Sequence, residues 1–142
     1  MLSAFDAEGV EYLIVGAYAL AGHGLPRATG DLDFWIRRSS ENAARVMRAL
    51  TAFGAPTDQI TEADLCAQDL VFQMGIEPSR IDVLTSIDGV EFDEAWPNRL
   101  MASVDGLVVP ILGREDLIRN KRAVGRDQDL ADVTRLQAEI RR

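Results

Sequence analysis

Three residue types are almost missing from this chain of 142 residues, which has one cysteine, Cys66, one histidine, His23, and one lysine, Lys121. A single cysteine excludes an internal disulfide and a cysteine-based zinc site, and it is typical of a reducing compartment. We expect Cys66 to serve in packing. We expect His23, between two glycines, to lie in a loop.

Long apolar runs are absent as well. No stretch approaches the roughly 20 apolar residues that a membrane-spanning helix requires. The first residues also lack the charged and apolar regions of a secretory signal. We therefore predict a cytoplasmic protein with no membrane segment.

Positive charge is scarce, and it is unevenly distributed. The net charge is −8, but residues 1–113 carry 7 basic and 17 acidic groups, whereas residues 114–142 carry 8 basic and 6 acidic groups. Such an acidic chain does not bind nucleic acid nonspecifically through a broad basic face. The composition is still compatible with binding of a nucleotide or of one RNA end. We expect an anion to bind at the C-terminal segment, where the basic residues are concentrated.

The length and the composition of the chain indicate one globular domain over residues 1–142. We expect a core over residues 10–112 and a helical segment over residues 113–142. The hydrophobic patterns predict an α/β (α+β) fold, with a mixed sheet of about four to six strands flanked by helices.

The expected elements follow from periodicity and from helix-stop residues. Apolar, β-branched stretches predict strands over 12–15, 31–36, 70–74, 80–85, 90–95 and 107–112, the last confined to a sheet edge by Pro110. Helical spacing predicts helices over 17–21, 40–53 (capped by Ser39 or Ser40), 61–67, 114–124 and 128–141, with Asp127 as the N-cap of the last.

Carboxylates occur where core strands ordinarily carry none. Asp31 and Asp33 lie two residues apart, so in an extended strand they point to the same face. Two carboxylates in a partly buried strand repel each other and lose hydration, so they favour a bound cation. Asp82 interrupts a second apolar strand. We therefore predict a divalent metal site.

A glycine turn precedes these acids. Gly16 ends the strand 12–15 and opens a helix, whose backbone amides suit phosphate oxygens. Three carboxylates beside such a turn would hold two Mg²⁺ ions about 3.5–4 Å apart for in-line phosphoryl displacement.

These acids also have structural interpretations. Asp31 and Asp33 could belong to a solvated strand face or could act as caps. Asp82 could form a salt bridge with Arg80. Trp35, on the same face as the acids, could stack a base or pack at the rim of the site.

Lys121 lies on the face of helix 114–124 that we expect to be buried, and a buried lysine needs a partner. Asp129 and Asp132 of the next helix could pair with it or with nearby arginines. The alternatives are a lysine that extends along the surface and acids that interact favourably with the helix dipole.

The motifs resemble those of the nucleotidyltransferase superfamily of the DNA polymerase β type. Its signature is a Gly-[Gly/Ser] turn followed by Asp-h-[Asp/Glu]-h, where h is hydrophobic. The resemblance is closest to small AbiEii-type proteins, the toxins of an abortive-infection system, and spans residues 12–136. It lies in Gly16-Ala17-x-Ala19-Leu20, in Arg27-x-Thr29-x-Asp31-Leu32-Asp33-Phe34, in Asp82, and in Leu117-Ile118-x-x-Lys121-x-x-x-x-Arg126-Asp127-x-Asp129-Leu130-Ala131-Asp132.

This resemblance implies a minimal nucleotidyltransferase fold with C-terminal helices. It also implies catalytic roles. Asp31 and Asp33 would ligate both metal ions, which would be Mg²⁺ or alternatively Mn²⁺. Asp82 would ligate the catalytic ion and help to activate the acceptor hydroxyl. Lys121 would hold a phosphate or neutralise developing charge.

The resemblance further implies a set of nucleotide-binding residues: Gly16, Ala17, Arg27, Thr29 and Asp129. Asp129 and Asp132 are expected to position Lys121 or Arg126 rather than to bind metal. Ala17 departs from the family pattern, which often has Ser or Gly there, so a hydroxyl that would contact a phosphate is absent.

Three functions follow from these observations. The first is Mg²⁺-dependent transfer of a nucleoside monophosphate from an NTP to a hydroxyl of an RNA 3′ end, a protein or a small molecule. In the AbiEii type, this would be a toxin neutralised by a separate antitoxin protein. The second is a catalytically weakened nucleotide-binding or interaction module, suggested by Ala17. The third, metal-dependent phosphodiester hydrolysis or sugar transfer, uses the same acids but does not explain the glycine turn.

Overall fold

The computed structural model describes residues 1–25, 30–76, 79–104 and 106–140. Its strands are β1 (Tyr12–Val15), β2 (Leu32–Ile36), β3 (Val71–Met74), β4 (Ile81–Leu84), β5 (Leu100–Val104) and β6 (Leu107–Ile111). They form one six-stranded sheet in the order β3-β4-β2-β1-β6-β5. The β1/β6 and β2/β4 pairs are parallel and the other pairs are antiparallel. The predicted mixed α/β sheet is confirmed.

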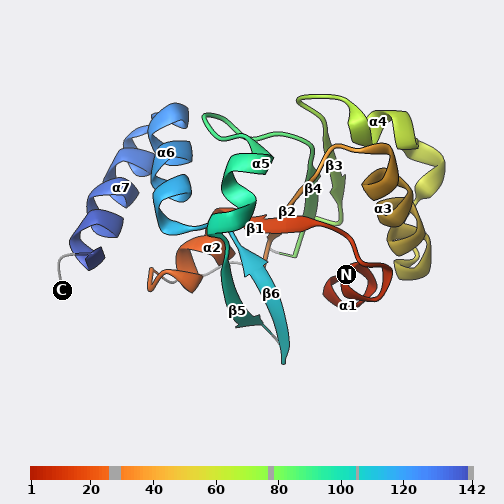
Figure 1. Cartoon of the computed structure of the whole chain (residues 1–142), viewed down its shortest axis with the longest axis horizontal. Coiled ribbons are helices and arrows are strands. Elements are labelled where there is room, and N and C mark those ends of the chain that lie inside the picture. Colours follow the sequence, from red (N-terminus) through yellow and green to blue (C-terminus); the bar gives the residue numbers. More distant parts are fainter. Residues whose placement is uncertain (26–29, 77–78, 105, 141–142) are drawn as a thin grey trace.

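Most of the helices lie at the two ends of the molecule, with α2 and α5 between them (Figure 1). They are α1 (Leu2–Glu8), α2 (Gly16–Gly22), α3 (Ser40–Phe53), α4 (Glu62–Cys66), α5 (Phe92–Ala95), α6 (Arg114–Val124) and α7 (Asp127–Ile140), with short 3-10 turns η1 (Thr57–Gln59) and η2 (Trp96–Asn98). Figure 1 shows α1, α3 and α4 at one end, α6 beside α7 at the other, and the β5–β6 hairpin extending away from the rest of the sheet. None of the described helices is long and apolar enough to cross a membrane.

Aromatic contacts define the two faces of the sheet. On one face, Phe5 of α1 packs against Tyr12 and Phe34, with ring centroids 5.3 and 4.7 Å away. On the opposite face, Trp35 meets Phe92 of α5 edge to face at 5.1 Å. Side chains alternate along β2, so Asp33 and Trp35 share the face that α5 covers. Trp35 is only 2% exposed, which supports the packing interpretation of this residue.

Local sequence signals explain the longest helix of the first half. The Ser39 hydroxyl accepts a hydrogen bond from the Asn42 N–H at 3.1 Å, and Gly54 ends α3 at a φ of 90°. A side-chain N-cap and a left-handed glycine are the expected start and stop of a helix. Cys66, at the end of α4, is half-buried and packs against the core.

Three predicted features are wrong. The stretch 90–95 is not a strand, because its buried residues Phe92 and Ala95 are three apart, which is a helical spacing, and they form α5. β6 is not an edge strand, because β5 covers its outer side. β6 pairs with β1 at Ile111. The pairing with β1 is therefore not interrupted by Pro110, which lacks an N–H and lies opposite Met101 of β5. Asp127 is the first residue of α7 rather than its N-cap.

Candidate functional site

Two of the predicted acids meet on adjacent strands. Asp33 of β2 is in register with Asp82 of the parallel strand β4, and on its other side it pairs with Val15 of β1. Burial, then the charge of Asp82 and a hydrogen bond to its carboxyl group, together raise the pKa of Asp33 to about 6. The charged form of Asp33 is therefore disfavoured here, mainly because the group is buried.

Gly16 lies directly against this pair. Its φ is +71°, and a Cβ added to it would lie 2.1 Å from Asp33 Oδ2. Only glycine adopts this backbone conformation readily and leaves room for the carboxylate. The turn from β1 into α2 is thus built to bring the backbone of Gly16, followed by Ala17, close to Asp33.

Arg80 supplies a counter-charge from within the chain. Its Nε and Nη2 donate to the two oxygens of Asp82 at 2.9 and 3.2 Å, and its backbone N–H donates to Asp31 Oδ1 at 2.8 Å. The salt bridge that was the structural interpretation of Asp82 is therefore present. Asp31 lies immediately before β2, where its charge also contributes to raising the pKa of Asp33.

The chemistry of the donor set fits a hard divalent cation. Asp31, Asp33 and Asp82 offer only carboxylate oxygens, which Mg²⁺ and Mn²⁺ prefer. The raised pKa of Asp33 indicates that burial and the neighbouring acids outweigh the charge of Arg80. Within the described ranges, however, no three acidic, histidine or cysteine side chains already have a metal-binding arrangement. A metal held by all three aspartates therefore requires their carboxylates to move closer together.

The predicted C-terminal residues form a separate cluster, the α6–α7 ion cluster, made of Lys121, Arg126, Asp129 and Asp132. The Lys121 ammonium lies 3.3 Å from Asp129 Oδ1 and 3.3 Å from Asp132 Oδ2, and both aspartates are only 1% exposed. Arg126 Nε donates to Asp129 Oδ2 at 2.6 Å. The Arg126 hydrogen bond, with a smaller contribution from Lys121, holds the pKa of Asp129 below its usual value despite burial.

This arrangement gives Lys121 and Asp129 partners of their own. Among the described residues, the Lys121 ammonium pairs with these two aspartates and with neither Asp33 nor Asp82. Asp129 Oδ2 also accepts from the backbone N–H of Arg126, just before α7, at 3.3 Å, while its contact with Lys121 links α7 to α6. The structure therefore brings Gly16, Ala17, Asp31, Asp33 and Asp82 together and places Lys121 and Asp129 in the ion cluster. Arg27 and Thr29 lie outside the described residues.

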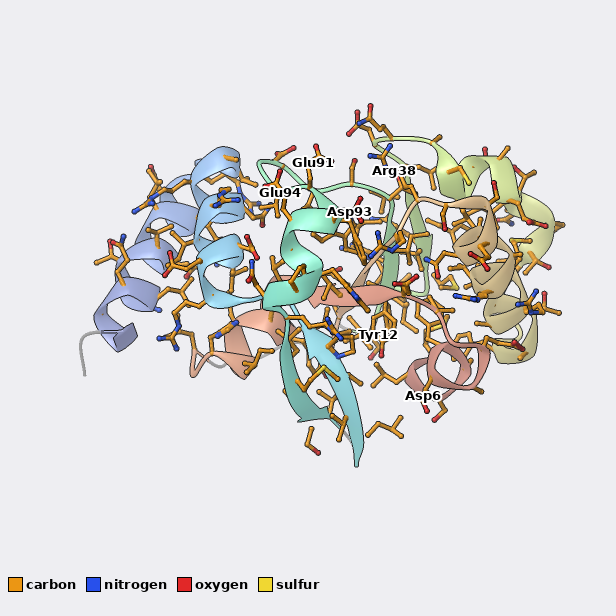
Figure 2. All side chains as sticks on the ribbon, viewed as in Figure 1. Asp6, Tyr12, Arg38, Glu91, Asp93 and Glu94 are labelled. Atoms are coloured by element: carbon orange, nitrogen blue, oxygen red, sulfur yellow. The ribbon has the colours of Figure 1, made fainter. Side chains whose placement is uncertain are left out.

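A polar cavity of about 540 Å³, the β2–β4 cavity, lies past the C-terminal ends of β2 and β4. Trp35 and Phe92 contribute aromatic surface to it, and its charged lining includes Arg38, Glu91 and Asp93. Figure 2 shows Glu91, Asp93 and the neighbouring Glu94 around α5. The sequence contains a signal for the β2–β4 cavity, because strand alternation places Trp35 on the same face of β2 as Asp33.

Comparisons with known proteins support the fold. No family model and no curated protein matches the chain. The crystal structure of a "putative nucleotidyltransferase" from Thermotoga maritima is similar, with a TM-score of 0.61 and 14% sequence identity over 96% of this chain and 88% of that chain. The chain thus has an α/β fold consistent with the nucleotidyltransferase fold that the sequence motifs imply.

Proposed function

We propose that this protein is a metal-dependent nucleotidyltransferase that moves a nucleoside monophosphate from an NTP to a hydroxyl group. The observation that carries the proposal is the meeting of Asp33 and Asp82 on adjacent parallel strands, directly against the backbone of Gly16. A phosphate chain near Gly16 would place its metal-binding oxygens beside both carboxylates. The similar fold of the Thermotoga maritima protein is a further support.

In this proposal Asp31, Asp33 and Asp82 hold Mg²⁺, or alternatively Mn²⁺. The bound metal would neutralise charge on the triphosphate and on the transition state. Gly16 allows close approach of the nucleotide to the strand acids. Arg80 keeps Asp82 in place before the metal binds, since its guanidinium contacts both carboxylate oxygens.

The reaction forms one bond and breaks one. The acceptor oxygen bonds to the α-phosphorus of the NTP, the bond from that phosphorus to the β-phosphate oxygen breaks, and pyrophosphate leaves. The hydroxyl proton would pass to the carboxylate of Asp82, which in this proposal helps to activate the acceptor.

The test is transfer of label from each α-³²P-labelled NTP, with Mg²⁺ or Mn²⁺, to RNA, protein and small-molecule acceptors. The proposal expects a labelled product that Asp33→Ala abolishes. Asp58→Ala, which removes an exposed carboxylate from η1, is the matched control and should keep the activity. If no acceptor is labelled in an Asp33-dependent way, the proposed transfer is wrong.

A weakened nucleotide-binding module is the second candidate. Two observations favour it: Ala17 brings no hydroxyl to the turn, and Arg80 occupies both oxygens of Asp82. Calorimetry with NTP and Mg²⁺ separates the candidates. NTP binding that Asp33→Ala weakens, in the absence of any transfer, would favour the module.

We also propose that the activity belongs to an AbiEii-type toxin, countered by a separate antitoxin protein. The support is the set of sequence motifs rather than the fold. Induced expression in a bacterial host should slow growth, and Asp33→Ala should restore it. Unimpaired growth with active enzyme in the cells would contradict the toxin role and leave the chemistry untouched.

A further inference from the structure

A second cavity, of about 450 Å³, lies where the end of α2, the junction of η2 with β5 and the start of α6 meet. We call it the arginine cavity, because its polar lining comes from His23, Asn98, Arg99 and Arg114. None of the described residues that line it carries a carboxylate, although the chain has a net charge of −8. The cavity is therefore a basic site in an acidic protein.

Arg114 is the residue that most needs a ligand. Its Nε atom is buried and has no hydrogen-bond partner, and no described carboxylate forms an ion pair with its guanidinium. Buried polar atoms in proteins nearly always have a partner, so an orphaned donor calls for an explanation, of which a bound ion or water is one. With 23 acidic residues in the chain, an arginine that pairs with none of the described carboxylates is unexpected.

Arg99 supplies a second, well-positioned guanidinium. Its Nη1 donates to the Trp96 carbonyl oxygen at 2.8 Å, and its Cζ lies 4.1 Å from the centre of the Trp96 ring. These two contacts fix the group, but they use only one of its five N–H donors. The described residues give it no ion pair, so its positive charge is available to the cavity.

The backbone adds to the positive character. The first N–H groups of any α-helix lack intrahelical acceptors, and Gly113, the N-cap of the 11-residue helix α6, provides no side-chain cap for them. Two acids, Glu115 and Asp116, lie in the same first turn. The C-terminal end of α2 lines the same cavity, and the carbonyl groups at a helix C-terminus carry partial negative charge. Its last carbonyls, however, accept hydrogen bonds from the N–H groups of His23, Gly24 and Leu25.

His23 forms a fixed and neutral part of the wall. It lies in the turn after α2, as expected, but it is only 8% exposed, and its Nε2 donates to the Leu112 carbonyl oxygen at 2.8 Å. Burial lowers the pKa of His23, and the charge of Arg114 lowers it further. The two arginines thus provide the charge of the cavity at neutral pH.

We propose that the arginine cavity binds a phosphate group of a phosphorylated ligand, with Arg114 and Arg99 as its charged contacts. Guanidinium groups bind phosphate through paired N–H donors, and a cavity of this volume accommodates a nucleotide-sized ligand. Gly16 and this cavity lie at opposite ends of α2, whose 7 residues span about 10 Å. The phosphate site is therefore separate from the Asp33–Asp82 pair.

If the proposed function holds, this phosphate belongs to the acceptor, which would then be a phosphorylated molecule such as an RNA strand. That extension rests on the proposed function. Phosphate binding in the cavity does not rest on the proposed function, because it requires neither a metal nor a transfer step.

The test is calorimetric titration of the intact protein, without divalent metal, using inorganic phosphate, adenosine 5′-monophosphate and a short RNA as probes. Arg114→Gln should weaken binding about tenfold or more, since it removes a charged phosphate contact. Arg122→Gln is the matched control, because Arg122 is exposed on the same helix and its replacement changes the net charge equally. This control should bind within about twofold of the unmodified protein.

Three further arms make the result decisive. Arg99→Gln tests the second contact and keeps the proposal testable if Arg114→Gln fails to fold. Asp33→Asn should bind the probes normally, which separates this site from the proposed active site. Tighter binding of RNA than of inorganic phosphate would identify a phosphodiester as the ligand, whereas equal binding would point to free phosphate.

The proposal is overturned if the unmodified protein binds none of the probes at about 10 mM, or if folded Arg114→Gln and Arg99→Gln bind as tightly as the Arg122→Gln control. Loss of binding in Asp33→Asn alone would also overturn it, because the ligand would then sit at the strand acids. Each of these results can be obtained whether or not nucleotidyl transfer is detected.

Discussion

Two pairs of aspartates in this protein have opposite electrostatic environments. In the α6–α7 ion cluster, Asp129 and Asp132 are almost fully buried but receive Lys121 and Arg126, and the pKa of Asp129 is lowered. On the strands, burial and the proximity of Asp82 raise the pKa of Asp33 to about 6. Both carboxylates of the helix pair have cationic partners, whereas in the strand pair Arg80 contacts Asp82 and the charged form of Asp33 stays disfavoured.

This difference also concerns the single lysine. The sequence motifs place Lys121 among the catalytic residues, with Asp129 and Asp132 expected to position it, and its ammonium is held by these two buried carboxylates, which join α6 to α7. The catalytic role of Lys121 stays a prediction. A lysine held in this way stabilises the helix pair. Asp33, by contrast, is the strand acid whose charged form the surrounding protein disfavours.

The largest expected effect comes from altering the strand site through its backbone. In Gly16→Ala, the new Cβ would overlap Asp33 Oδ2, which lies 2.1 Å from its position. We expect nucleotidyl transfer to fall about 100-fold, as for an ångström-scale displacement of a catalytic group. Gly9→Ala is the control, because Gly9 has a similar φ of +68° but no atom within 4 Å of the added Cβ. Equal activity in the two variants would contradict the close-approach account.

Breaking the helix cluster should affect stability more than chemistry. Lys121→Met removes the ammonium from two buried carboxylates, and loss of one partner of a buried ion pair costs about 3–5 kcal/mol. Since Lys121 is 12% exposed, we expect a loss near 3 kcal/mol, measured by urea unfolding. Arg122→Met on the exposed side of α6 should change the free energy of unfolding by less than about 0.5 kcal/mol. Unchanged stability with lost transfer would instead assign Lys121 to catalysis.

Replacement of Arg80 tests whether a bound metal displaces the Arg80 guanidinium from Asp82. Arg80→Gln removes the guanidinium from Asp82, so Mg²⁺ no longer competes with it. We expect Mg²⁺ affinity, measured by calorimetry, to tighten roughly threefold, a modest gain because this ion pair is partly exposed. Arg38→Gln, which removes the same charge from the β2–β4 cavity, should leave the affinity unchanged. Weaker Mg²⁺ binding in Arg80→Gln would show that Arg80 supports the site rather than competing with the metal.

The smallest effect is on the pH dependence of stability. The pKa of Asp33 is about 6 in the folded protein and 3.8 for an unperturbed carboxyl group. The folded state therefore binds more protons between these values, so the free energy of unfolding decreases as pH rises from about 4 to 6. In a chelator, Asp33→Asn should show a weaker decrease across this range than the unmodified protein. Parallel curves for the two proteins would contradict the raised pKa.

The sequence predicted the elements that carry strong local signals. The Asp31-x-Asp33 strand, the glycine turn and the helix between Ser39 and Gly54 are all present, because strand alternation, positive φ and capping are short-range effects. The α5 helix and the interior position of β6 depend on contacts with distant strands, so the sequence misassigned them.

The candidate site could be predicted only in part for the same reason. The sequence identifies Asp33 and Asp82, and it raises the Arg80 salt bridge as an alternative, but which atoms meet is decided by the β2–β4 register. The arginine cavity was beyond prediction, since it joins His23, Arg99 and Arg114 from three distant segments.

The most direct test of the central claim is a crystal structure with Mn²⁺ and a non-hydrolysable NTP analogue, with the metal located by its anomalous scattering. We predict an anomalous peak within about 2.5 Å of carboxylate oxygens of both Asp33 and Asp82, with the triphosphate beside Gly16. A bound analogue whose metal lies away from these carboxylates, with the Arg80–Asp82 pair intact, would contradict the account.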